Sequence, residues 1–190
     1  MLFLLFGSSG AGKTTVLGLL RGTIDRLATH DFDEVGVPPG ATIAWRREQN
    51  ERWLMHALAL QGGGNDLLLA SQTPLGELLA APSARRLDGI AGCLLDCDDA
   101  TRVARLAGRG EDWLAGMGGS LDDVLAWAEW MRGHARDPSW RPDVLGQTPA
   151  ETSTRAATWR VNTIDTSTLS PDAAAEAVRT WIEGERAARS

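Results

Sequence analysis

The residues with the clearest chemical potential lie in a glycine-rich stretch near the start of the chain. Gly7, Gly12, Lys13 and Thr14 fit the phosphate-binding pattern G-x-x-x-x-G-K-[ST] in full. In such a loop the backbone N–H groups turn toward phosphate oxygens, and the following helix adds partial positive charge. Lys13 is expected to reach the β- and γ-phosphates, and the Thr14 hydroxyl to ligate Mg²⁺. The stretch therefore predicts an ATP-binding loop made of Gly7, Ser8, Ser9, Gly10, Ala11, Gly12, Lys13, Thr14 and Thr15.

Composition singles out Lys13 as well. The chain has 190 residues, and Lys13 is the only lysine among its 19 basic residues. A chain that uses arginine everywhere else places its single compact ammonium in the glycine-rich loop. This placement favours direct contact between Lys13 and phosphate oxygens.

Two carboxylates follow at a spacing of two in the stretch "HDFD". If the stretch is extended at the carboxyl end of a strand, Asp31 and Asp33 share one side of it and face the ligand crevice. One carboxylate can hold Mg²⁺ or contact substrate, and the other can accept the proton of an attacking hydroxyl. We assign the first role to Asp31 and the catalytic base to Asp33. The alternative is a solvated acidic loop.

An arginine series lies in "TRVARLAGRG". Arg102, Arg105 and Arg109 recur at intervals of three and four residues and so share one face of a helix. On a mobile flap, these guanidinium groups would neutralise charge that spreads over the γ-phosphate. The alternative is an ordinary solvated helix face paired with the preceding aspartates.

The acceptor side is less defined by the sequence. Gln72, after a predicted strand, could bind a hydroxyl or a base edge, or simply cap the strand end. Trp45 could stack on a ring, and Arg46 with Arg47 could grip an anionic acceptor. The alternative for these three is a packed tryptophan and a solvated arginine pair.

Tryptophans are frequent in a predicted lid or insertion at about 108–157. Core packing is the first expectation for Trp127 and Trp130, and a hydrophobic acceptor pocket or a dimer face is the alternative. The tryptophans of this region are Trp113, Trp127, Trp130 and Trp140.

Strand and helix patterns alternate along the chain, which predicts an α/β, three-layer P-loop fold. We expect one domain, residues 1–190, with a parallel sheet of about five strands and the helical lid region. Thr73 is predicted to cap a helix with Pro74 at its first position, and Ser170 and Pro171 to do the same for the last helix. The predicted strands are 1–6, a short one ending near the paired aspartates, 65–71, 90–96 and 159–165; the predicted helices are 13–28, 41–60, 73–81, 98–110, 119–135 and 170–188.

Charge and composition exclude several classes. A net charge of −6 argues against a protein that wraps nucleic acid. The apolar opening "MLFLLF" is too short to cross a membrane and lacks a basic leader, so we expect a cytoplasmic protein with no membrane partner. Cys93 and Cys97, about 13 Å apart if they share a strand, are expected to be buried free thiols. The oligomeric state is left open.

Four kinds of P-loop protein compete. A GTPase needs motifs that "DEVG" at 33–36 and "NTID" at 162–165 match only in part. A motor-type ATPase needs a strand that ends in acids, which Asp96 could imitate, and a nucleotide sensor needs no acceptor. A small-molecule kinase accounts best for the paired aspartates and the arginines. A P-loop ATPase or nucleotide-dependent switch, with water as acceptor, is the main alternative.

These segments resemble the nucleoside monophosphate kinase superfamily, which includes adenylate, shikimate and gluconate kinases and chloramphenicol phosphotransferase. The resemblance covers about residues 1–35, 65–110 and 158–185, and the glycine-rich loop is its most specific motif. It implies phosphate and Mg²⁺ binding by Lys13 and Thr14, metal and substrate contacts by Asp31 and Asp33, and ATP contacts by Arg105 and Arg109. "SQTPLGE" replaces the acceptor-binding segments of the shikimate and nucleotide kinases. The acceptor group, a hydroxyl or a phosphate, therefore stays open, as does its carrier: a nucleoside, a nucleotide, a sugar acid or an antibiotic.

Overall fold

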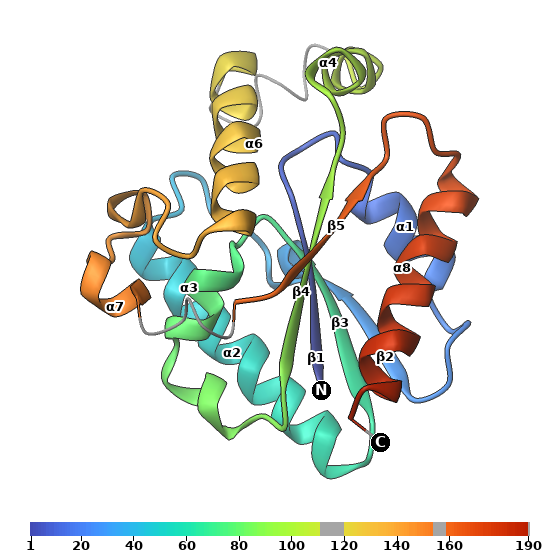
Figure 1. Ribbon diagram of the computed structural model, residues 1–190, viewed down its shortest axis with the longest axis vertical. Coiled ribbons are helices and arrows are strands. Elements are labelled where there is room, and N and C mark those ends of the chain that lie inside the picture. The colour runs from blue at the N-terminus through green and yellow to red at the C-terminus, as the bar shows by residue number, and fades with distance from the viewer. Residues whose placement is uncertain (111–119, 154–158, 190) are drawn as a thin grey trace.

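The computed structural model describes residues 1–110, 120–153 and 159–189. A parallel sheet of five strands forms its centre, in the order β2-β3-β1-β4-β5. This arrangement confirms the predicted α/β fold and strand number (Figure 1). The strands are β1 (Leu2–Phe6), β2 (Leu27–Asp31), β3 (Asp66–Ser71), β4 (Ile90–Asp96) and β5 (Val161–Asp165).

β1 is the central strand, and its sequence explains why. All five residues of "LFLLF" are buried, as expected where helices cover both faces of a parallel sheet. Phe6, its last residue, lies in register with Ser71 at the end of β3 and with Leu94 near the end of β4. The loops that follow β1, β3 and β4 therefore leave the sheet at the same edge.

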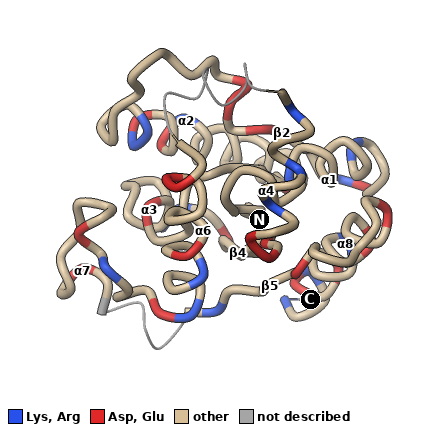
Figure 2. The backbone as a smooth tube through the Cα atoms, turned by 90° about the horizontal axis from the view of Figure 1, so that it is seen from above, with Lys and Arg blue, Asp and Glu red and all other residues tan. Residues whose placement is uncertain are grey.

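Helices cover the two faces of the sheet (Figure 1). α1 (Lys13–Leu20) and α8 (Pro171–Ala187) pack on one face, and α2 (Ile43–Gly62), α3 (Leu75–Ala80) and α6 (Leu121–Arg136) contribute to the core on the other. Seen from above, α4 lies near the middle of the molecule, between these two groups (Figure 2). The remaining elements are α4 (Asp99–Ala107), α7 (Pro149–Ser153) and the 3-10 turns η1 (Phe32–Val35), η2 (Pro82–Arg86) and η3 (Pro142–Leu145).

Two predicted boundaries were wrong. The helix predicted at 13–28 ends at Leu20, and Leu27 already begins β2. Gly22 (φ 71°) and Arg26 (φ 55°) adopt left-handed conformations between them, which a helix does not allow. Thr73 does not cap α3: Pro74 is the N-cap residue, and Thr73 is buried. The side chain that bonds the first turn comes from α6, where His134 Nε2 accepts from Gly76 N at 3.2 Å. The cap predicted for α8 is confirmed, since Ser170 Oγ accepts from Ala173 N at 3.2 Å.

The tryptophans of α6 belong to the core, as expected. The rings of Trp127 and Trp130 stack with centroids 4.8 Å apart, and Trp130 lies in the buried cluster with Met131. Trp140 is exposed, and Trp113 lies outside the described residues. Within the described part of the chain, no helix combines the length and apolar character that crossing a membrane requires. Cys93 and Cys97 are buried free thiols.

Candidate active site

The glycine-rich loop joins the buried end of β1 to the start of α1. Gly10 (φ 81°) and Gly12 (φ 98°) both take the left-handed conformation that favours glycine. Gly12 is also the N-cap of α1, and no side chain caps that helix. The N–H groups of the first turn are therefore available at the loop, which suits an anion.

Lys13 folds back into this loop. Its Nζ donates to the carbonyl oxygens of Gly7 at 2.8 Å and Ser8 at 3.2 Å. Burial lowers the pKa of Lys13 to about 8, although the nearby Asp31 carboxylate acts in the opposite direction. A bound phosphate would restore a strong preference for the ammonium form.

The two aspartates reach the same cavity by a different geometry from the one predicted. Asp31 is the last residue of β2, but Asp33 lies in the 3-10 turn η1 and not on an extended strand. Asp31 caps this turn: its Oδ1 accepts from Asp33 N at 3.1 Å. Its Oδ2 accepts from the Thr14 hydroxyl at 3.3 Å. Partial burial, and then the charge of Asp31, raise the pKa of Asp33.

One cavity of about 200 Å³ contains most of the predicted site residues, and we call it the phosphate cavity because the predicted phosphate-binding loop lines it. The glycine-rich loop forms one side of it, and the ends of β2 and β3 form another. Ser71, which we did not predict, joins the site because it ends β3 directly beside β1. The lining residues are Ser9, Gly10, Gly12, Lys13, Thr14, Asp31, Asp33, Ser71, Gln72 and Arg109.

The three arginines of the predicted mobile flap have three different surroundings. Arg102 is fully buried; it donates to Ser9 O at 2.6 Å and pairs with Asp96, so its place on a mobile flap was wrong. Arg105 donates from Nη2 to Thr166 O at 2.7 Å and from Nη1 to Gly10 O at 3.2 Å. Arg109 follows the end of α4 and lines the phosphate cavity. Arg102 thus supports the loop from beneath, and Arg109 faces the ligand space.

A second cavity of about 220 Å³ adjoins the first and shares Gly12 with it. Arg105 and the start of α8 both line it. Part of this cavity comes from the glycine-rich loop, but no motif marks the residues that follow the last strand. The residues that line it are Ala11, Gly12, Thr15, Val16, Arg105, Thr166, Leu169, Ser170, Pro171 and Ala174.

The residues expected to bind the acceptor are divided. Gln72 lines the phosphate cavity. Arg46, in contrast, forms an ion pair with Glu77 in which Nη2 lies 2.8 Å from Oε2, and its Nε also faces the carboxylate at 2.9 Å. Trp45 packs edge-on against Phe32, with ring centroids 6.1 Å apart. Neither Trp45 nor Arg46 lines the phosphate cavity.

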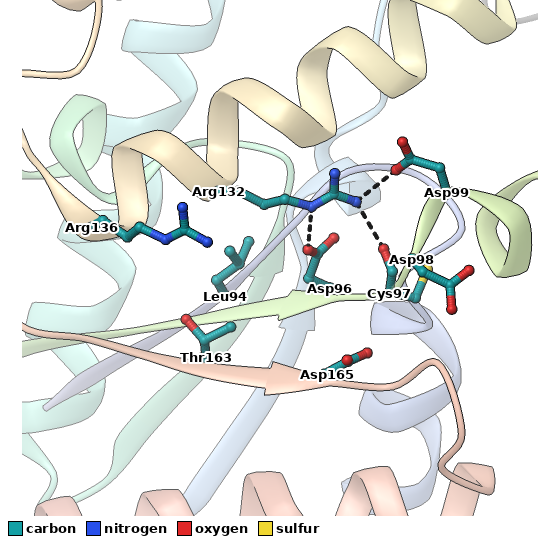
Figure 3. Close-up of a pocket in the computed structure, with 9 residues that line it drawn as sticks. All are labelled: Leu94, Asp96, Cys97, Asp98, Asp99, Arg132, Arg136, Thr163 and Asp165. Atoms are coloured by element: carbon teal, nitrogen blue, oxygen red, sulfur yellow. Dashed lines mark hydrogen bonds and ion pairs between the residues drawn. The ribbon is translucent and has the colours of Figure 1, made fainter.

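A third cavity, of about 470 Å³, lies between α6 and the ends of β4 and β5 (Figure 3). Arg132 crosses it from α6: its Nε lies 2.6 Å from Asp96 Oδ2 and its Nη2 lies 2.7 Å from Asp99 Oδ1. Asp96 therefore pairs with Arg132 and with Arg102. A carboxylate held by two guanidinium groups is poorly placed to act as the metal-binding or water-activating acid of a motor ATPase.

No family model matches the chain, and no curated protein matches it significantly. Solved structures do match it over almost its whole length. The unliganded sugar kinase from Janibacter sp. HTCC2649 is 16% identical with a TM-score of 0.55, covering 96% of this chain and 94% of that one. Shikimate kinase from Aquifex aeolicus is 15% identical with a TM-score of 0.51, covering 98% of each chain. An uncharacterized protein from Eubacterium ventriosum is 12% identical with a TM-score of 0.53, covering 97% and 98%. The chain thus shares its fold with small-molecule kinases.

Proposed function

We propose that this protein is an ATP- and Mg²⁺-dependent kinase that transfers the γ-phosphate to a small-molecule acceptor. One observation carries the proposal: a single cavity holds Lys13 and Thr14 of the glycine-rich loop together with Asp31 and Asp33. A nucleotide-binding site thereby adjoins a candidate base. The fold shared with a sugar kinase and a shikimate kinase supports the same reading. In this proposal residues 1–190 form one kinase domain, with about 108–157 as its lid region.

Lys13 would bind and orient the triphosphate. It now donates to two loop carbonyls, so an incoming phosphate oxygen would exchange these bonds for charge-assisted ones. The loop N–H groups would hold the neighbouring oxygens. Arg109 would contact the transferring group from the far side of the cavity, and Arg105 would contact the nucleoside part in the second cavity.

Thr14 and Asp31 offer a fitting site for Mg²⁺. Their side-chain oxygens lie 3.3 Å apart beside the loop, and both are hard donors of the kind Mg²⁺ prefers. Among the described residues, no group of three or more His, Cys, Asp or Glu side chains could hold a metal by itself. This agrees with an ion that takes one or two protein ligands and the substrate phosphates. When bound, Mg²⁺ would neutralise charge on the β- and γ-phosphates.

Asp33 would act as the general base. A bond forms between the acceptor hydroxyl oxygen and the γ-phosphorus while the bond from that phosphorus to the β–γ bridging oxygen breaks. ADP leaves, and the hydroxyl proton passes to an Asp33 carboxylate oxygen. The raised pKa of Asp33 suits this task, because a more basic carboxylate accepts a proton more readily.

The direct test is ADP release from ATP and Mg²⁺, with and without pooled hydroxyl compounds. A kinase predicts that at least one pool raises turnover far above the basal rate and that a phosphomonoester appears. Substantial turnover that no pool changes, with inorganic phosphate as the product, would favour the ATPase or switch.

A further inference from the structure

We propose that the phosphoryl acceptor is a hydroxyl compound without a negative charge, either neutral or carrying an amino group. This inference rests on the proposed kinase function and names the substrate class of the same site. It excludes nucleotides, sugar acids and shikimate-like acids as preferred acceptors.

The charges around the phosphate cavity carry the first step. Lys13 and Arg109 are the basic residues among those that line it, and the proposed function assigns both to the triphosphate. The acceptor side, at the ends of β2 and β3, presents Asp31 and Asp33 with the uncharged Ser71 and Gln72. An anion beside these carboxylates and a bound triphosphate would be repelled, whereas an ammonium would be attracted.

The second step concerns the arginines expected to grip an anion. Arg46 holds Glu77, whose side chain is 1% exposed, so releasing Arg46 would leave a buried carboxylate without its partner. Arg47 donates from Nη2 to the carbonyl oxygens of Leu145 at 2.9 Å and Gly146 at 3.3 Å. The guanidinium groups of Arg46 and Arg47 are therefore both bonded within the protein.

A separate cavity of about 230 Å³, lined in part by α2 and α3, has a similar balance of charges. Glu77 and Glu151 line it together with Arg47, so it is no more basic than the phosphate cavity. Asn50 also lines it, but its side-chain oxygen is buried, so the charged groups decide which acceptors this cavity favours.

The test separates acceptors by charge before their identity is known. A deproteinised bacterial extract is passed over an anion exchanger, giving a neutral-and-cationic fraction and an anionic fraction. Each is incubated with the protein, Mg²⁺ and γ-³²P-labelled ATP, and labelled products are resolved by chromatography. We expect a new labelled phosphomonoester from the neutral-and-cationic fraction and little from the anionic one.

The other outcomes are distinct. Product from the anionic fraction alone, or equally from both fractions, would overturn this inference and leave the proposed kinase intact. Labelled inorganic phosphate as the sole product from both fractions would overturn the kinase itself. Matched pairs that differ in charge, such as glucosamine with gluconate and adenosine with AMP, give the same comparison with defined probes.

A charge change at Gln72 supplies a second readout. Gln72 is exposed and lies beside the carboxylates, so Gln72→Arg adds a cation on the acceptor side. We expect this variant to raise kcat/KM for anionic members of the matched pairs at least about tenfold relative to neutral ones. Gln72→Met, of similar length but uncharged, is the control. An equal effect of both variants would show that charge does not set acceptor choice.

Discussion

Lys13 shows how one residue's surroundings can set the working pH of a site. In the free protein, burial lowers its pKa from 10.5 to about 8. Asp31 and Asp33 act against this shift, whereas Arg102 and Arg109 add to it. Because the charged form binds phosphate, affinity for MgADP should fall as pH rises through about 8.

The measurement is the dissociation constant of MgADP by calorimetry from about pH 6 to about pH 10. The affinity for MgADP should begin to fall at a pH well below the ordinary lysine pKa. A fall that begins only near pH 10.5 would contradict the burial of Lys13 in this site. Bound phosphate raises the pKa of Lys13 again. The loss of kcat at alkaline pH should therefore occur at a higher pH than the loss of kcat/KM.

Asp33→Asn tests the base. The amide keeps the size of the side chain but cannot accept the proton, so kcat should fall by about 10²- to 10⁴-fold. The dissociation constant of ATP should change little, because Asp33 contacts the acceptor and not ATP in the proposed mechanism. Asp25→Asn is a suitable control, since that side chain is 97% exposed in a surface turn. Unchanged turnover in Asp33→Asn would remove Asp33 from the mechanism.

The position of Lys13 and Thr14 at the cavity could be predicted, because it depends on the local spacing of the glycine-rich stretch. Arg102 could not, since Arg102, Arg105 and Arg109 share the same helical periodicity. Only the packing of α4 against the glycine-rich loop buries Arg102 and leaves Arg109 at the cavity. The pairing of Arg46 with Glu77 is likewise invisible in the sequence, because the two residues lie 31 positions apart on different helices.

At the scale of elements, the loop after β1 depends on the close approach of β4. A Cβ at Gly7 would lie 2.2 Å from the carbonyl oxygen of Leu95, which cannot move without disturbing the sheet. Gly7→Ala should therefore destabilise the fold by about 1–3 kcal/mol and weaken nucleotide binding. Gly18→Ala is the matched control within α1, where a Cβ meets nothing within 4 Å. It should stabilise the protein by about 0.5–1 kcal/mol. Urea unfolding compares the two, and equal effects would contradict the contact.

α4 is anchored by Arg102. Arg102→Met should lower the free energy of unfolding by about 3 kcal/mol, because Asp96 and the carbonyl oxygens of Ser9 and Cys97 lose a buried donor. Asp96 keeps Arg132, which places the expected loss at the lower end of the usual range. Arg109→Met, at the exposed end of the same segment, should cost less than about 1 kcal/mol and should chiefly slow turnover. Similar stability of both variants would contradict the structural role of Arg102.

Element types were easier to predict than their ends. Apolar runs gave the strands 65–71 and 90–96 almost to the residue, since β3 and β4 are buried. The helix beginning at Lys13 was extended too far because "RGTIDRLA" keeps an apolar spacing that a helix would also show. Gly22 and Arg26 in this stretch adopt left-handed conformations. These conformations depend on the turn into β2 and not on local propensity.

At the scale of the whole molecule, the strand order brings together loops that lie far apart in the sequence. β1 lies between β3 and β4, which brings the loops after residues 6, 71 and 96 to one edge of the sheet. The cavity beside Arg105 arises from the same order, because β5 beside β4 delivers Thr166 and the start of α8 to the loop. No motif marks those residues, so topology had to be known before the second cavity could be recognised.

Because the glycine-rich loop contacts β4, α4, α6 and the segment after β5, a bound nucleotide should stabilise the entire fold. At a free MgADP concentration of 100 times its dissociation constant, the gain is about 2.7 kcal/mol, which corresponds to a rise in Tm of roughly 5–11 °C for a domain of this size. Lys13→Ala should lose most of this shift, whereas Asp33→Asn should keep it. Scanning calorimetry with and without MgADP measures both. A full shift in Lys13→Ala would place the nucleotide elsewhere, while its loss in Asp33→Asn would make Asp33 a nucleotide-binding residue instead of a base.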